Sequence, residues 1–482
     1  MVDVLLINPR HNGRSEIPPL GLECLASMLL HDGLDVAICD LDAGIPLEKC
    51  DEFLSREIRL HNPGIIGVSS MSGSYASAAR VCEIAKEMDP GLLTVMGGIH
   101  ASVLAEPVLR DNPSVDAVVR GEGEISFSEL VRRFLKKESF WEIRGISFRR
   151  KGRIIHNPDQ VLISNLDDLP APAHGLVDNR LYRTRSISSA RGCFHRCTFC
   201  SIQSQYHGKV RTRDVGRVVE EIGALISCGA KRIMFTDDNF TYDMKRVRDI
   251  CAQIKRRSIN GRVEFFAEGR IDDICRNPLI AGILSDAGFR GIYIGAESGS
   301  QEILDYYRKD IDTDDLARGV AYCVEQNLTP VVNFILFGPR DSIRTIRETI
   351  SQARNLYENG AEITFAEMLI PYPGTPIHEE LKINGKFVET QGAFHFQPYG
   401  ELDIERLLRI CDLSRGIADL LHAGDYLFQE KKTYLRLGYI DEMISGQVPR
   451  EFDEAYKSHA TTGRVPQEIE NIHKELNLLA IN

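Results

Sequence analysis

The chain has 482 residues, 43% of them hydrophobic and 26% charged, and this length predicts two or three folded domains rather than one core. Its formal net charge of −11 is carried by scattered acidic residues, which argues against nucleic acid as a partner. The sequence contains no apolar run long enough to span a membrane and no cleavable N-terminal leader, so we expect a cytoplasmic protein.

Residues 1–137 alternate short apolar runs with amphipathic segments. The apolar runs predict five buried parallel strands, at 3–7, 36–39, 65–68, 92–96 and 117–119. The segments between them predict helices at 20–31, 47–60, 74–88, 101–109 and 125–136. This alternation predicts a doubly wound, Rossmann-like α/β domain, which binds its ligand at the carboxyl ends of the strands.

The loops that follow these strands are polar or rich in glycine. They contain Asn8-Pro9, Ser69-Ser70-Met71, Gly97-Gly98-Ile99-His100 and Arg120-Gly121-Glu122-Gly123-Glu124. Each segment taken alone is also typical of an ordinary tight turn.

Residues 138–183 are predicted to connect two domains. The basic run at 149–153 fits a hairpin turn, and prolines at 170 and 172 interrupt regular structure. Residues 381–482 predict a small, mostly helical region, with 407–421 as its clearest amphipathic helix. We expect this last region to contribute to substrate binding.

Residues 184–380 repeat the alternation of strand and helix. Strands are predicted at 186–190, 232–236, 263–267, 291–295, 331–337 and 363–368, which suggests a partial (β/α)6 barrel open on one side. The active site of such a barrel lies at the carboxyl ends of its strands. The polar candidates near those ends are Cys193, Asp237, Asp238, Glu268, Arg270, Glu297, Ser298 and Tyr372.

Three of the twelve cysteines, Cys193, Cys197 and Cys200, occur together in the segment ARGCFHRCTFCS. The other nine are isolated, mostly in apolar patterns, and are expected to be small buried side chains. With His195, the three clustered cysteines supply the donors of a Cys3His zinc site. Alternatively, three thiolates bind three corners of a [4Fe–4S] cube and leave the fourth iron open to a substrate. The setting at a barrel strand end favours the iron cluster.

The C-x3-C-x2-C run, with Phe199 before its last cysteine and a six-unit half barrel around it, resembles the radical S-adenosylmethionine superfamily. The segments FTDDNF (235–240), GAESGS (295–300) and PYPGTP (371–376) are similar to signatures of its cobalamin-binding branch. In the first domain, PPLGL (18–22), GGIH (97–100) and GEGE (121–124) are similar to the B12-binding domain of that branch. The resemblance covers residues 2 to about 380.

The resemblance implies three cofactors: a [4Fe–4S] cluster held by Cys193, Cys197 and Cys200, S-adenosylmethionine, and cobalamin. It implies that S-adenosylmethionine is cleaved to methionine and a 5′-deoxyadenosyl radical. Cobalamin would then carry a methyl group to an unactivated carbon or phosphorus centre of a small molecule. An electron donor such as flavodoxin or ferredoxin is the implied partner.

The resemblance and the strand-end positions together assign further site residues. Those assigned to S-adenosylmethionine are Phe199, Asp237, Asp238, Glu268, Arg270, Glu297 and Ser298. Those assigned to cobalamin are Asn8, Pro19, Leu20, Ser69, Ser70, Met71, Gly97, Gly98, His100, Gly121 and Glu122. Tyr372 is assigned to substrate.

Several of these residues have a structural alternative. Asp237 or Asp238 can cap the helix that begins near Tyr242. Glu297 can accept hydrogen bonds from the amides that follow it. Glu268 and Arg270 can form an ion pair, and Tyr372 can pack within its proline-rich turn.

Two segments depart from the family pattern. The cobalt-ligating segment D-x-H-x-x-G is absent, and NPRHNG (8–13) stands in its place. The lower axial position of cobalt is therefore expected to be empty or held by water, with His11 and His100 as lesser candidates. GPRD (338–341) stands where relatives have G-L-P-G-E.

Three alternative functions follow from the same motifs. The first is a radical cyclase or rearrangement enzyme with the same cofactors. The second is a cobalamin-free methylthiotransferase, which needs a further three-cysteine cluster for which Cys24, Cys39 and Cys50 are poorly spaced. The third is a non-enzymatic B12 sensor, which would have no use for the clustered cysteines.

Overall fold

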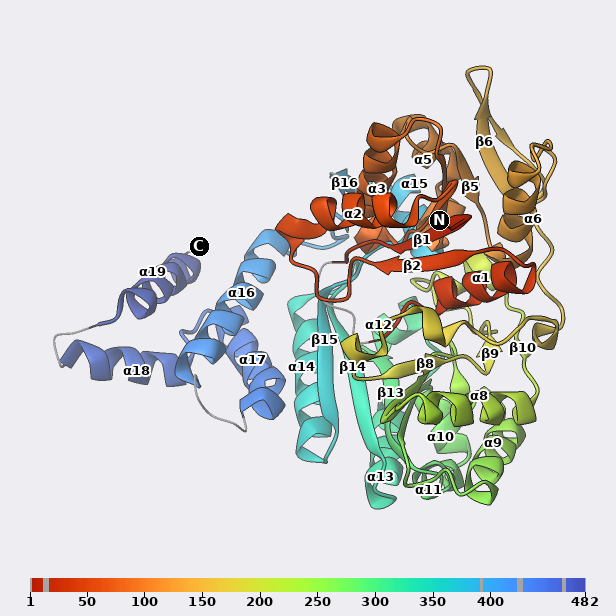
Figure 1. Ribbon diagram of the computed structural model, residues 1–482. Coiled ribbons are helices and arrows are strands. Elements are labelled where there is room, and N and C mark those ends of the chain that lie inside the picture. Colours follow the sequence, from red (N-terminus) through yellow and green to blue (C-terminus); the bar gives the residue numbers. More distant parts are fainter. Residues whose placement is uncertain (1, 12–16, 391–392, 423–427, 462–464, 482) are drawn as a thin grey trace. The chain divides into compact units, whose positions relative to one another are not determined.

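In the computed structural model, which describes residues 2–11, 17–390, 393–422, 428–461 and 465–481, the N-terminal region forms a seven-stranded sheet (Figure 1). Its strand order is β2-β1-β3-β4-β5-β6-β7. The parallel strands are β1 (Val4–Asn8), β2 (Val36–Asp40), β3 (Ile65–Ser69), β4 (Leu93–Gly97) and β5 (Ala117–Val119). The helices that connect them are α1 (Leu20–His31), α2 (Cys50–His61), α3 (Tyr75–Met88), α4 (Ile99–Val103), α5 (Ala105–Asp111) and α6 (Gly123–Leu135). The predicted doubly wound α/β class is confirmed.

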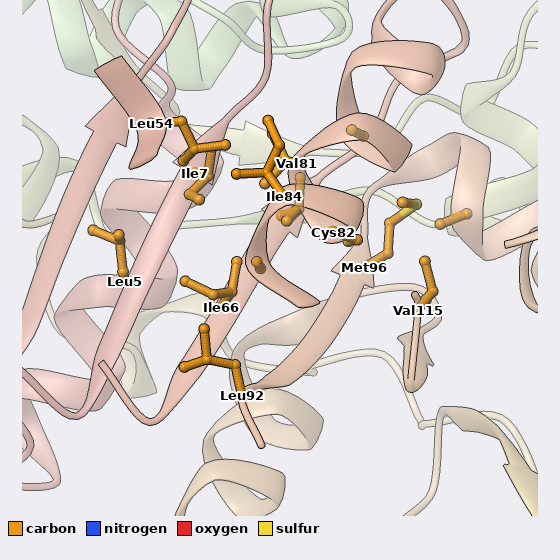
Figure 2. Packing of buried hydrophobic residues seen from close by; sticks show 14 of the residues in the cluster. Leu5, Ile7, Leu54, Ile66, Val81, Cys82, Ile84, Leu92, Met96 and Val115 are labelled. Carbon is orange, nitrogen blue, oxygen red and sulfur yellow. The ribbon is translucent and has the colours of Figure 1, made fainter. Parts of the chain in front are cut away.

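Both faces of this sheet are buried. Leu5 and Ile7 of β1 pack with residues of α2 and α3 in one hydrophobic core, which Figure 2 shows together with Met96. Val4 and Leu6 point to the other face and belong to a second core, to which α1 and α6 contribute. Because successive side chains of a strand alternate between the two faces, a sheet covered on both sides needs apolar residues at every position.

The prediction of one continuous helix over 101–109 is wrong, because the structure has two short helices there. The chain leaves helical geometry at Leu104, where φ is −110° and ψ is 35°, so that α4 and α5 are separate helices. The reason is Pro107. Its nitrogen has no hydrogen to donate to the carbonyl of Val103, and its ring would clash with that carbonyl in a continuous helix.

The hairpin predicted around residue 151 is present. Its strands, β6 (Ile146–Arg150) and β7 (Arg153–His156), extend the sheet antiparallel to β5. Lys151 and Gly152 form the turn with φ of 48° and 74°. Positive φ at both central positions is typical of a two-residue type I′ turn, which suits the twist of the strands.

The chain divides into two compact units, the first comprising Met1–Ala267, Tyr372–Glu379 and Glu389–Phe394. Its second half contains the parallel strands β8 (Arg185–Ile187), β11 (Arg232–Phe235) and β12 (Glu264–Gly269), of which β12 continues into the second unit. Between them come α7 (Ile202–Tyr206), α8 (Val215–Ser227) and α9 (Met244–Arg256). The strand β9 (Ala190–Arg191) precedes the clustered cysteines and β10 (Arg211–Thr212) follows them. The two strands pair with each other in a short antiparallel ladder.

The first strand of the predicted barrel is shorter than expected. It ends at Ile187, and the chain forms the separate strand β9 before it reaches Cys193. The reason lies at Ser189, whose amide donates to the carboxylate of Asp237 instead of continuing the strand pairing.

The second unit comprises Glu268–Pro371, Glu380–Val388 and His395–Asn482. Its parallel strands are β13 (Phe289–Glu297), β14 (Thr329–Phe337) and β15 (Glu362–Met368), with β14 between the other two. Its helices up to β15 are α10 (Ile271–Arg276), α11 (Leu279–Asp286), α12 (Gln301–Tyr306), α13 (Thr313–Glu325) and α14 (Ile343–Glu358). The strands of both units supply the six parallel βα units that the sequence predicts.

The region after β15 is mostly helical, as predicted. Its elements are α15 (Pro376–Ile383), β16 (Phe387–Thr390), β17 (Ala393–Phe396), α16 (Ile404–Leu421), α17 (Phe428–Ile444), α18 (Arg450–Thr461) and α19 (Gln467–Ile481). The hairpin of β16 and β17 was not predicted. No helix within the described ranges is both long and apolar enough to cross a membrane.

Six of the nine isolated cysteines are buried, as expected for small apolar side chains. They are Cys39, Cys50, Cys82, Cys251, Cys323 and Cys411. Cys24 and Cys275 are half-buried, whereas Cys228, at the end of α8, is exposed and contradicts the expectation.

Candidate functional site

The three clustered cysteines lie on a loop, residues 192–201, that begins directly after β9 and is called the cluster loop below. Gly192, its first residue, has φ of 98°, a backbone conformation that L side chains rarely adopt. A Cβ atom at this position would overlap the carbonyl oxygen of Lys209. The chain can therefore leave the β9–β10 ladder toward Cys193 along this path only with glycine at 192.

Hydrogen bonds from two helices hold the cluster loop in place. The side-chain amide of Gln203, on α7, donates to the carbonyl oxygen of Cys193 at 2.7 Å and to that of His195. The backbone amide of Ile377, on α15, donates to the carbonyl oxygen of Thr198 at 3.0 Å. These bonds engage backbone carbonyls of the loop and do not involve the cysteine sulfur atoms.

The three thiols are close enough to influence one another. Burial raises the pKa of the Cys200 thiol to about 12, and the neighbouring Cys197 and Cys193 add to this shift. Yet no group of three His, Cys, Asp or Glu side chains in the described part of the chain is placed to hold a single metal ion. Zinc needs all its sulfur donors at about 2.3 Å from one centre. A [4Fe–4S] cluster has no such single centre, because each of three thiolates binds a different iron at its own corner.

Asp237 and Asp238, which follow β11, support the segment that leads to the cysteines. The Asp237 carboxylate accepts hydrogen bonds from the amide and hydroxyl of Ser189, at 2.6 and 2.5 Å. Burial raises the pKa of Asp237 to about 6, although these hydrogen bonds oppose the shift. Asp238 accepts a hydrogen bond from the amide of Gly192 at 2.6 Å. Both carboxylates thus position the backbone at the base of the cluster loop.

A cavity of about 430 Å³ lies within the first unit, between the doubly wound domain and the segments next to the cluster loop. One wall comes from α1, the ends of β3, β4 and β5, and the start of α6, and the other from β9, α7 and the residues after β11. Seven of the residues assigned to cobalamin line this cavity: Leu20, Ser69, Met71, Gly97, Gly98, Gly121 and Glu122.

Glycines shape the wall of the cavity on the side of the sheet. Gly98 has φ of 89°, and a Cβ atom there would lie 2.5 Å from the carbonyl oxygen of Ser70. At Gly121 a Cβ atom would meet no atom within 4 Å, and at Gly97 it would meet only the carbonyl oxygen of Val119, at 3.7 Å. Side chains at these two positions would occupy open space, so the glycines let a large ligand approach the backbone. This cradle fits cobalamin.

Part of the cavity lining is apolar. Leu6, Val95 and Val119 of the sheet line it together with Phe127 of α6. Gly67 lies among them, and a Cβ atom at this position would approach Leu6 and Phe127 to 2.8 and 2.9 Å. Sequence reasoning missed these residues, because apolar positions inside a strand carry the same signal whether they face core or cavity.

Four residues assigned to cobalamin are not part of the cavity wall: Asn8, Pro19, Ser70 and His100. Asn8 donates a hydrogen bond to Asp40 at 2.9 Å. His100 packs against the ring of Tyr75 at 4.2 Å, and its Nδ1 lies 3.1 Å from the hydroxyl of Ser72. Burial lowers the pKa of His100 to about 4, so this imidazole is neutral at pH 7. Neither His100 nor His11 lines the cavity, and no other described histidine does.

Sequence reasoning also missed Cys24, on the α1 side of the cavity. It missed the residues Arg191, Tyr206 and Thr236 of the opposite wall as well. Arg191 and Tyr206 lie within a few residues of the clustered cysteines, and Thr236 directly precedes Asp237. Proximity to a recognised motif was thus the signal that could have identified them.

Glu297 is the last residue of β13 rather than the residue after it, because a register shift between β13 and β14 falls at this position. Its φ is 66°. The carboxylate accepts a hydrogen bond from Nζ of Lys309 at 2.7 Å, and both side chains are largely buried. The partner is therefore a lysine that the sequence analysis did not identify. The neighbouring Ser298 lies 2.9 Å from the hydroxyl of Thr349.

The remaining predicted residues are in varied surroundings. In the second unit, Arg270 is buried and donates to Asp272 at 2.8 Å, while Glu268 is exposed. In the first unit, Phe199 is half-buried on the cluster loop. The carbonyl of Tyr372 accepts a hydrogen bond from the Thr375 hydroxyl at 2.6 Å, and the Tyr372 side chain is partly exposed.

Comparisons with known proteins agree with these observations. The model of the B12 binding domain matches residues 10–131, and that of the Radical SAM superfamily matches residues 187–353. An uncharacterized methyltransferase of Pyrococcus horikoshii is 32% identical over 75% of this chain and 78% of that protein. The anaerobic magnesium-protoporphyrin IX monomethyl ester cyclase of Rubrivivax gelatinosus is 28% identical over 82% of this chain and 72% of that protein.

Among solved structures, the cobalamin-dependent S-adenosylmethionine radical enzyme OxsB has the same fold, with a TM-score of 0.77 at 17% identity over 99% of this chain and 79% of that one. The fold and the three-thiol loop define a radical S-adenosylmethionine enzyme. More particularly, the chain belongs to the cobalamin-binding family of these enzymes, whose cofactors are a [4Fe–4S] cluster, S-adenosylmethionine and cobalamin.

Proposed function

We propose that this protein is a cobalamin-dependent radical methyltransferase, which transfers a methyl group to an unactivated carbon or phosphorus centre of a small molecule. The observation that supports it is the position of the glycine-lined cavity, one wall of which is formed by the segments that carry the cluster loop. The two cofactor sites are neighbours within one compact unit. A reductant such as flavodoxin or ferredoxin would supply the electron.

In this proposal Cys193, Cys197 and Cys200 ligate the cluster. When bound, the cluster supplies the electron that cleaves S-adenosylmethionine, and cobalamin supplies a methyl carrier. The chain itself positions the cofactors. Gln203 and Asp238 fix the backbone of the cluster loop, and the glycine cradle admits cobalamin.

The proposed contacts of S-adenosylmethionine are Phe199, Asp237, Asp238, Glu268, Arg270, Glu297 and Ser298, and Tyr372 is the proposed substrate contact. Asp238 is the best supported, since it lines the cavity and is partly buried next to the cluster loop. Asp237 is the least supported, because Ser189 already occupies both of its carboxylate oxygens.

The cluster assignment is tested by replacing one thiol. We expect anaerobically reconstituted wild-type protein to contain about four irons per chain, as a [4Fe–4S] cluster requires. Cys197→Ala should lose 5′-deoxyadenosine formation by chromatographic assay and still bind cobalamin, because Cys197 is not part of the cavity wall. Cys228→Ala is the matched control, since this thiol is exposed at the end of α8. Undiminished cleavage in Cys197→Ala would remove the assignment.

Methyl transfer is distinguished from cyclisation by the fate of S-adenosylmethionine. The cyclase relative is a reason to retain cyclisation as the second candidate. A methyl carrier must be recharged, so methyl transfer predicts S-adenosylhomocysteine in addition to 5′-deoxyadenosine when reduced, cobalamin-loaded protein is assayed. A cyclase yields only 5′-deoxyadenosine, and that result would exclude the methyltransferase proposal.

A further inference from the structure

The carboxylate of Glu122, which the sequence assigns to cobalamin, is already engaged by three protein donors. Its Oε1 accepts a hydrogen bond from Arg191 at 2.9 Å. Its Oε2 accepts one from Arg211 at 2.6 Å and one from the amide of Ile163 at 3.0 Å. The Glu122 side chain is only 3% exposed. These contacts leave the carboxylate little capacity to bind a ligand, although the residue lies at the cavity wall.

The two arginines that Glu122 contacts face each other across the β9–β10 ladder. Arg191 is paired directly with Arg211 in this antiparallel ladder, which is only two residues long. Side chains at directly opposed positions lie on the same face about 5 Å apart, and like charges there destabilise the pairing. Without a counter-charge, this ladder would be pushed apart by its own arginines. Glu122 supplies that charge to both.

A second carboxylate completes the charge balance. Glu124 accepts a hydrogen bond from the other terminal nitrogen of Arg191 at 2.6 Å. This group of four charged side chains thus contains two arginines and two glutamates, and all four are largely buried. In such surroundings the loss of one partner leaves an uncompensated charge out of water, which is costly.

The same group of charges reaches both cofactor sites. Arg191 directly precedes Gly192 and stands two residues before Cys193, so its position determines where the cluster loop begins. The guanidinium of Arg211 lies 5.1 Å from the centre of the Tyr206 ring, and Tyr206 lines the cavity. One carboxylate from the doubly wound domain therefore supports the base of the cluster loop and part of the cavity wall.

We propose that Glu122 is a positioning residue for the cluster loop, which holds the β9–β10 ladder closed by neutralising Arg191 and Arg211, and is not a ligand of cobalamin. The inference rests on the proposed function only for the identity of the group that the loop binds. In this proposal the GEGE segment (121–124) holds the cluster loop in position next to the cavity.

The decisive experiment uses Glu122→Gln, which keeps the shape of the side chain and removes its charge. Wild-type and variant protein are reconstituted with iron and sulfide without cobalamin, reduced, and compared by electron paramagnetic resonance. We expect altered g-values and a lower iron content in the variant. After cobalamin is added, we expect 5′-deoxyadenosine formation to be about tenfold to a hundredfold slower, the cost of a small misplacement of reacting groups. An unchanged cobalamin-free spectrum, with only weaker cobalamin binding, would show a ligand and overturn the proposal.

A second substitution tests the charge argument itself. Arg211→Gln in the Glu122→Gln background removes the cation that the lost carboxylate neutralised and leaves Arg191 paired with Glu124. The double variant should regain the wild-type spectrum and iron content, which a role of Glu122 as a cobalamin ligand does not predict. If Glu122→Gln alone does not fold, recovery of folded, iron-containing protein in the double variant still supports the proposal. Failure of the double variant to recover contradicts it.

Glu129→Gln is the matched control on α6, the helix that Glu122 directly precedes, where Glu129 pairs with Arg133. It should leave the spectrum unchanged. Failure of the proposed function would be recognised separately, because wild-type protein would then contain no four-iron cluster. In that case the thermal unfolding midpoint of the cluster-free chain still tests the ladder: Glu122→Gln should lower it and the added Arg211→Gln should restore it.

Discussion

Gly192 combines two constraints that an alanine cannot satisfy, an unfavourable φ of 98° and no room for a Cβ atom beside the Lys209 carbonyl. We predict that Gly192→Ala lowers the free energy of unfolding by about 1–3 kcal/mol, the usual cost of a residue held in a disfavoured backbone region. It should also lower the iron bound after reconstitution, because Cys193 is the next residue. Chemical denaturation and iron assays measure both effects.

Gly223→Ala is the control for this substitution. Gly223 lies within α8, and a Cβ atom there would meet nothing within 4 Å. Alanine in a helix interior is favoured over glycine by about 0.5–1 kcal/mol, so this variant should be slightly more stable and bind a full complement of iron. Equal behaviour of the two variants would show that the geometry at residue 192 is not restrictive.

The site residues differ in how far the sequence revealed them. Cys193, Cys197 and Cys200 lie within eight residues of one another, so their shared role is visible without a structure. Glu122 was assigned to cobalamin from its position after a strand, without its charged partners in view. Its partners Arg191 and Arg211 are 69 and 89 residues away, and no local pattern reports a contact over such a distance.

The helix after the FTDDNF segment begins with a cap that the sequence analysis placed elsewhere. Neither Asp237 nor Asp238 caps α9; the side chain of Asp243 accepts hydrogen bonds from the amides of Lys245 and Arg246. We predict that Asp243→Ala lowers the free energy of unfolding by about 1 kcal/mol, the typical worth of an N-cap. Urea denaturation measures the change. Asp249→Ala, at an exposed position of the same helix, should have a much smaller effect, and equal losses would refute the cap.

The elements themselves were largely predictable, because periodicity is a local property. Most predicted strands and helices of the doubly wound domain are present within a few residues of their expected ends. The errors occur where one residue interrupts a pattern. Pro107 divides α4 from α5, and Ser189 leaves the first barrel strand to bind Asp237. The break at Pro107 could have been predicted from the sequence. The end of the strand before Ser189 could not, because it depends on where the folded chain places Asp237.

Within the first unit, His174 links the doubly wound domain to the barrel segments. It lies in a short 3-10 turn (His174–Leu176) of the predicted connector. Its Nδ1 is 2.8 Å from Glu23 on α1, and its Nε2 is 3.1 Å from Glu221 on α8, which also pairs with Arg213. Burial opposes the charged imidazolium, but the hydrogen bonds and charges of Glu221 and Glu23 outweigh it and raise the pKa of His174 to about 9.

This link predicts a stability that falls with rising pH. Below the ordinary histidine pKa of 6.5 both folded and unfolded chains carry the proton, and the full contribution is present. Between pH 6.5 and about 9 only the folded state keeps it, so the contribution, on the order of 3 kcal/mol, is progressively lost. Urea unfolding midpoints at pH 6, 8 and 9.5 measure the decline. His174→Gln should flatten it, and an equally steep decline in that variant would contradict the assignment.

The sequence by itself determined the fold class, the clustered thiols and the glycine-rich strand ends. Each of these is written in residues a few positions apart, where the periods of helix and strand or the spacing of ligands are directly legible. Only the tertiary structure decided what the polar residues do: Glu122 neutralises two opposed arginines, Glu297 pairs with Lys309, and His100 packs in the core. The reason is physical. A buried charge must find a counter-charge, and only the folded chain determines which distant residue provides it.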